Sequence, residues 1–123
     1  MKIRISKTDK LFSEYIRRRA IVRSGGCERC GTWKTDYKQL QCAHLISRWH
    51  KSIRWDEEAA IGLCGGCHLW IDHEAEEKIA LCKKFIGEDG YEQLLSRSRA
   101  IGKPDEAMIQ LYYTSKLNEL EKL

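Results

Sequence analysis

Two pairs of cysteines, each pair closely spaced, constrain this 123-residue chain more than any other feature of its sequence. Each pair has the spacing Cys-x-x-Cys, and the four residues are Cys27, Cys30, Cys64 and Cys67. Such a pair lets two thiolates from one tight turn reach the same ion at about 2.3 Å, and two pairs complete a tetrahedral zinc site. The 33 residues between the pairs have to fold back on themselves, as a hairpin would. A structural Zn²⁺ would add folding free energy directly, which a chain this short needs because its core is small.

Two other functions of these cysteines have to be weighed. The segment CGGCH at 64–68 matches the pattern of c-type haem attachment, with His68 as the axial ligand. That interpretation requires an exported protein and leaves the first cysteine pair unexplained. A dithiol redox site would need only one pair, so two matched pairs favour a metal. Cys42 and Cys82 have no partner at ligand spacing and are expected to be small buried hydrophobic residues.

Composition excludes a membrane protein and favours a cytoplasmic one. One third of the residues are charged, and the apolar runs are far shorter than the roughly 18 residues of a membrane span. The first 15 residues contain four basic side chains but no apolar stretch or cleavage site, so we expect no secretory signal. We therefore expect a single domain over residues 1–123 in the reducing cytoplasm, where cysteines bind metals more often than they form disulfides.

The net charge of +4 is unevenly distributed along the chain. Residues 1–24 hold eight basic and two acidic side chains, whereas residues 64–123 hold eight basic and eleven acidic ones. The basic first quarter includes the run Arg17-Arg18-Arg19 and could meet a phosphate backbone, which attracts Lys and Arg regardless of base sequence. A solvated helix face would explain the same charges.

Local patterns predict an α+β chain with a short antiparallel hairpin between helices. Apolar residues at helical spacing predict a helix over about 9–23, which Ser6 or Thr8 can cap and Gly25-Gly26 ends. Segments 40–45 and 59–63 are the expected strands. A helix over about 67–86 should end at Gly87, and further helices are expected within about 88–122, the last of them beginning at Pro104.

The four histidines lie within one 30-residue window that also holds several basic residues. His44 ends a predicted strand beside a cysteine, and His68 directly follows the last zinc cysteine, so the metal turn would fix where its side chain points. For His50 and His73 a structural role is the simpler interpretation. The first two histidines are therefore the candidates for chemistry.

These segments together resemble the HNH endonucleases of the ββα-metal fold, particularly the zinc-stabilised phage and prophage branch and the NinG-like recombination proteins. The resemblance covers about residues 27–75 and depends on Cys27-x-x-Cys30, CAHLISR at 42–48 and RWDEEAAIGLCGGCH at 54–68. It implies an HNH core over about 27–86, in which two zinc knuckles hold the hairpin. The basic helix and the C-terminal helices would flank this core.

The resemblance also implies the roles of individual residues. His44 would be the general base, and His68 would bind a catalytic Mg²⁺ or Mn²⁺. Many members have Asp as a second metal ligand where this chain has Ala43, and Asn where it has Ala59. Asp72 lies four residues after His68, on the same helix face, and could supply the missing oxygen ligand.

The implied activity is metal-dependent cleavage of DNA that leaves 5′-phosphate and 3′-hydroxyl ends. A histidine with a pKa of about 6.5 can take a proton from the attacking water, and a divalent metal stabilises the leaving oxygen. The side chains expected to hold DNA phosphates are Arg17, Arg18, Arg48, Lys51 and Arg54. Trp49 and Trp55 are either groove contacts or core residues. The alternative function is a zinc-knuckle DNA-binding module without catalysis, which the two departures from the family pattern favour.

Overall fold

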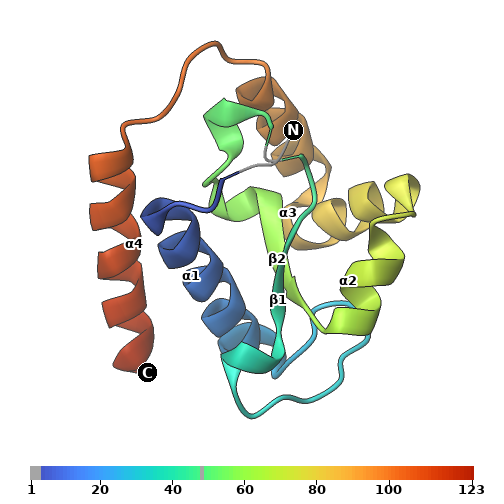
Figure 1. The fold of residues 1–123 in the computed structure, drawn as a ribbon. Helices are drawn as coiled ribbons and strands as arrows, with labels where there is room; N and C mark the ends of the chain where they lie inside the picture. The colour runs from blue at the N-terminus through green and yellow to red at the C-terminus, as the bar shows by residue number, and fades with distance from the viewer. Residues whose placement is uncertain (1–3, 48) are drawn as a thin grey trace.

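The computed structural model describes residues 4–47 and 49–123, and in this part of the chain the fold is α+β (Figure 1). The elements in order are α1 (Lys7–Ser24), η1 (Tyr37–Gln39), β1 (Gln41–His44), η2 (Lys51–Ile53), η3 (Glu57–Ala59), β2 (Ala60–Leu63), α2 (Gly65–Ile71), α3 (Ala75–Ser98) and α4 (Glu106–Glu121). The two strands stand between α1 and α4 on one side and α2 on the other. None of the described helices is long and apolar enough to cross a membrane.

Helix α1 begins at a capping box and ends at a glycine. The Ser6 hydroxyl accepts a hydrogen bond from the Asp9 backbone N–H at 3.2 Å, and the Ser6 N–H donates to the Asp9 carboxylate at 2.8 Å. Gly25 adopts a left-handed conformation (φ 72°) that closes the last turn. The predicted helix is confirmed and starts two residues earlier than expected.

The two strands form the predicted antiparallel hairpin, with a register that runs from Gln41 opposite Leu63 to His44 opposite Ala60. All four residues of β2 are buried. A Cβ atom on Gly62 would lie 2.6 Å from the Cβ atom of Ala20, so only glycine lets α1 pack this closely on the hairpin.

Two hydrophobic clusters lie on the two sides of the hairpin. The first contains Ala43 of β1 together with Cys67 and Ile71 of α2 and residues of α3. The second joins α1, α4, Trp55 and Ala60, and Cys42 of β1 packs against it. Because side chains alternate across a strand, β1 presents Ala43 to the α2 side and Cys42 to the α1 side.

The helix predicted over 67–86 is wrong in one respect, because the chain turns within it. Helix α2 stops at Ile71, and α3 starts at Ala75. At this junction the His73 N–H bonds to the Trp70 carbonyl at 3.2 Å, an i to i+3 bond that tightens the last turn. No glycine or proline marks this end in the sequence. The predicted stop at Gly87 appears as a kink inside α3, where this residue has φ 77° and ψ 173°.

Candidate metal centre and histidine groove

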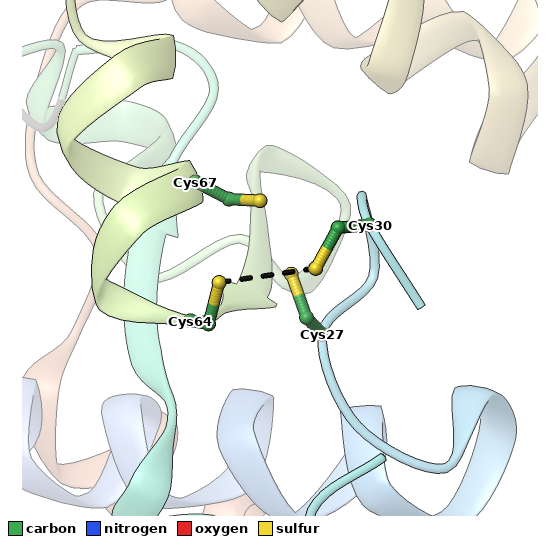
Figure 2. A group of neighbouring side chains, drawn as sticks. All are labelled: Cys27, Cys30, Cys64 and Cys67. Atoms are coloured by element: carbon green, nitrogen blue, oxygen red, sulfur yellow. Dashed lines mark hydrogen bonds between the residues drawn. The ribbon is translucent and has the colours of Figure 1, made fainter. Parts of the chain in front are cut away.

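The four paired cysteines converge on one point (Figure 2). Their sulfur atoms all lie within 4.8 Å of one another, and the Sγ atoms of Cys30 and Cys64 are 3.9 Å apart. Four sulfurs at 2.3 Å from a tetrahedral zinc would be separated by about 3.8 Å. The donor set therefore fits zinc, and the predicted grouping of these cysteines is confirmed.

The first knuckle is a tight turn that depends on two glycines. The Gly31 N–H donates to the Cys27 carbonyl, and the Cys27 N–H donates to the Thr32 carbonyl, both at 3.1 Å. Gly31 has φ 78°, the left-handed region that side chains disfavour. A Cβ atom on Gly26 would lie 2.1 Å from the Thr32 carbonyl oxygen, which would separate the paired segments at the base of the turn.

Glu28, between the first two cysteines, fastens this knuckle to β2. Its side chain is fully buried, and its Oε1 accepts a hydrogen bond from the Gly62 N–H at 3.0 Å. Its backbone N–H donates to the Gly62 carbonyl at 2.9 Å, while Arg23 and Ser24 donate to its carboxylate. Because β2 leads directly into the second knuckle, this clamp brings the two cysteine pairs together. The sequence analysis missed Glu28, since no local pattern distinguishes it from a surface acid.

The second knuckle begins α2, with Cys64 as the N-cap residue and Cys67 in the first turn. An Arg29 N–H donates to the Cys67 sulfur at 3.3 Å, and the guanidinium lies 3.7 Å above the Trp70 ring. On the other knuckle, hydrogen bonds from Thr32 lower the pKa of the Cys30 thiol to about 6. Burial raises the pKa of the Cys67 thiol to about 12, and the hydrogen bond from Arg29 acts against this rise. Both contacts thus stabilise the thiolate, which is the form that binds a metal.

His68 and Asp72 lie close together on the outer side of α2. The His68 Nδ1 atom is 2.7 Å from the Gln41 Oε1 atom. In the neutral tautomer that donates this hydrogen bond from Nδ1–H, the Nε2 lone pair is the one that can bind a metal. The His68 Nε2 atom is 3.9 Å from the Asp72 Oδ1 atom, and Lys78 Nζ is 3.7 Å from the same oxygen. A divalent ion at about 2.1 Å from each ligand could touch both. In the described part of the chain, three or more potential metal ligands come together at the four cysteines, and His68 and Asp72 are a pair.

His44 lies on the other side of the hairpin. Its ring centroid is 5.7 Å from that of Phe12 on α1, and its Nε2 atom is buried. Strand alternation places Gln41, the partner of His68, on the opposite face from His44. The structure therefore brings His68 to Asp72 but does not bring His44 to the same cavity.

His44 instead lines a groove between β1 and the first half of α1, with a volume of about 570 Å³. Lys10 and Arg17 contribute positive charge to this groove, and Phe12 and Cys42 contribute apolar surface. Asp9 and Glu14 also line it, and their carboxylates pair with Arg54 and Arg18. Cys42 is only half-buried, whereas Cys82 is buried as expected, and burial raises the pKa of Cys82 to about 11.

Arg54 is engaged within the protein. Its guanidinium donates to both carboxylate oxygens of Asp9, at 3.0 and 2.6 Å, and Trp55 Nε1 donates to Asp9 at 2.9 Å. Burial alone would raise the pKa of Asp9, but hydrogen bonds from Arg54, Ser6 and Trp55 lower it to about 2. Arg54 thus ties the segment after η2 to the start of α1, and any phosphate would compete with Asp9 for it.

The other expected DNA contacts differ in exposure. Arg17 and Arg18 stack on the Tyr37 ring, with guanidinium carbons 5.1 and 4.1 Å from its centroid. Lys51 and Trp49 are exposed. The predicted contact Arg48 lies outside the described residues.

Part of the basic run in α1 serves the fold. Arg19 donates to the backbone carbonyls of Glu57 and Ala60, each at 2.9 Å, and Arg23 bonds to buried Glu28. The charge of the run is thus divided between internal contacts and the surface.

Comparisons of the chain with protein-family models, curated proteins and solved structures found no match.

Proposed function

We propose that this chain is an HNH-type DNA endonuclease that hydrolyses phosphodiester bonds on a zinc-stabilised ββα-metal scaffold. The observation that supports this function best is the position of His44 in an open groove that also contains Lys10 and Arg17. This groove combines a candidate base with cations that attract phosphate.

The chemistry needs a proton acceptor and positive charge near the scissile phosphate. Neutral His44 can accept a proton from water as that water attacks phosphorus. Arg17 and Lys10 would hold the phosphate oxygens. His68 and Asp72 would hold a divalent Mg²⁺ or Mn²⁺, which supplies Lewis-acid chemistry when bound. Because they lie on the opposite face of the hairpin from His44, positive charge beside the His44 groove would come from Lys10 and Arg17.

The zinc is structural in this proposal, because all four of its ligands come from the protein and no coordination position is open. Purified protein should contain about one tightly held Zn²⁺ per chain, which elemental analysis would measure. A chain that is folded without metal, or that binds a different number of ions, would contradict the four-cysteine site.

A second candidate function is a zinc-knuckle DNA-binding module without catalysis. Ala43 and Ala59 stand where the family has a metal ligand and an asparagine, and both side chains are buried in the first hydrophobic cluster. The separation of His44 from His68 across the hairpin favours the same alternative. Binding would then depend on the basic residues alone.

Incubation of the protein with supercoiled plasmid and Mg²⁺ or Mn²⁺ separates the two functions. We expect nicked or linear product that DNA ligase can reseal, and loss of cleavage in His44→Ala. The matched control is His50→Ala, which removes an exposed histidine outside the groove and should leave cleavage unchanged. Zinc content and circular dichroism have to be the same in all three proteins.

DNA binding without cleavage under either metal would favour the non-catalytic module. Cleavage that persists in His44→Ala would remove His44 as the base.

A further inference from the structure

One stripe of α1 borders two neighbouring hollows. Lys10, Arg17 and Ile21 are separated by seven and four residues, so they share one face of this helix, and Arg18 follows Arg17. Lys10 and Arg17 line the His44 groove, and Arg18 and Ile21 line a second hollow of about 360 Å³ together with segment 35–38. The stripe spans 11 residues, or about 16 Å at 1.5 Å per residue.

Tyr37 joins the two hollows. Its ring lies under the guanidinium groups of Arg17, which lines the first hollow, and Arg18, which lines the second. Tyr37 also lines the second hollow and is only half-buried. Planar arginine and aromatic groups are the surfaces on which unpaired bases stack.

The two acidic groups that line the His44 groove are paired with arginines. Glu14 pairs with Arg18 at 2.9 Å, and Asp9 pairs with Arg54. Arg17 donates to the Ser13 carbonyl and hydroxyl, which are uncharged, so these bonds do not neutralise its charge. In the second hollow Asp36 keeps its negative charge beside Lys38, because it accepts only a backbone N–H. The positive charge of Lys10 and Arg17 is thus available for phosphates.

The position of His44 limits the shape of the substrate. Its Nε2 atom is buried between β1 and α1, so a phosphate has to enter the groove to approach the ring. The bases of a double helix are paired and stacked on one another and cannot reach Tyr37 or the arginine planes, whereas the unpaired bases of a single strand can. We infer that the two hollows and Tyr37 form a track for single-stranded nucleic acid, and this inference rests on the proposed function because it specifies the form of the substrate.

Binding should be measured without added divalent metal, so that cleavage does not contribute. The probes are a fluorescein-labelled 12-nucleotide single strand and the duplex of the same sequence, followed by anisotropy between 50 and 200 mM salt. We expect tighter binding of the single strand. Tyr37→Leu should weaken it by about fivefold or more with an unchanged salt slope, because stacking is lost and no charge is removed.

Arg17→Ala should weaken binding of the single strand and lower the slope of log K against log salt by about 0.7, the value for one phosphate contact. The matched control Arg99→Ala removes an exposed arginine that lines neither hollow and should change binding little. Tyr37→Phe keeps the ring and should bind like the wild type, which separates stacking from misfolding.

Equal or tighter binding of the duplex overturns the inference, and so does wild-type binding by both Arg17→Ala and Tyr37→Leu. Single-strand binding without any nuclease activity would keep the inference and remove the proposed catalysis. Binding and cleavage of the duplex but not of the single strand would keep the proposed nuclease function and remove the single-strand inference.

Discussion

The buried carboxylate of Asp9 joins α1 to Arg54 and Trp55, and removing its charge should lower the stability of the protein. The carboxylate receives hydrogen bonds from Arg54, Trp55 and the Ser6 backbone, and the Asp9 residue is only 8% exposed. The substitution Asp9→Asn keeps its size and removes its charge. The asparagine amide would also place its NH₂ group against Arg54 or Trp55, which donate to the Asp9 carboxylate, so one hydrogen bond would be lost.

The pKa of Asp9 sets the magnitude of this effect. It falls from 3.8 to about 2 in the folded protein. At 1.36 kcal/mol per pKa unit, the charged carboxylate contributes about 2 kcal/mol to the free energy of unfolding at neutral pH. Because the folded pKa is the lower one, this contribution is complete above about pH 4 and disappears as the pH falls through about 2.

Urea unfolding followed by tryptophan fluorescence at pH 7, 5 and 3 would measure it. Acid would also protonate the four cysteine thiolates that fit a zinc ion, and it would do so in both proteins. The difference between wild type and Asp9→Asn is therefore the quantity to follow. We expect a difference of about 2 kcal/mol at pH 7 and 5, and about half of that at pH 3. The control Asp89→Asn changes an exposed carboxylate and should differ from wild type by less than about 0.5 kcal/mol at neutral pH. A difference for Asp9→Asn that is equally small, or that does not shrink in acid, would refute the reasoning.

Three further predictions follow from single contacts. Arg29→Ala removes the hydrogen bond to Cys67 and should release zinc to a chromogenic chelator faster than Arg29→Lys, which keeps the positive charge; equal rates would contradict a role for the guanidinium. Gly62→Ala forces a Cβ atom against Ala20 and should lower the free energy of unfolding by about 1–3 kcal/mol, measured by urea unfolding, whereas wild-type stability would show that α1 can shift at no cost. Cys82, which is buried and has a raised pKa, should resist iodoacetamide in the folded protein and react after unfolding in urea, as peptide mass spectrometry would show.

Local patterns in the sequence were sufficient for the secondary structure wherever a strong signal marked an end. Ser6 and Gly25 bound α1 as expected, and the predicted strand segments around Cys42 and Ile61 pair as a hairpin. The break after Ile71 was not predicted, because nothing between α2 and α3 interrupts helical spacing or disfavours helix. An end of this kind depends on packing against the rest of the molecule, which no local pattern records.

For the candidate site, the sequence by itself predicted which four cysteines come together, because Cys-x-x-Cys spacing already places two thiols on one turn. Only the tertiary structure decided which charges serve the fold. It used Arg54, Arg19 and Glu28 in internal contacts that link residues up to 50 positions apart in the chain. It also decided that His44 faces α1, because a shift of one residue along β1 would turn its side chain toward α2 instead. Spacing along a chain fixes neighbours within a turn, but the face of a strand that meets a given helix depends on how the whole chain packs.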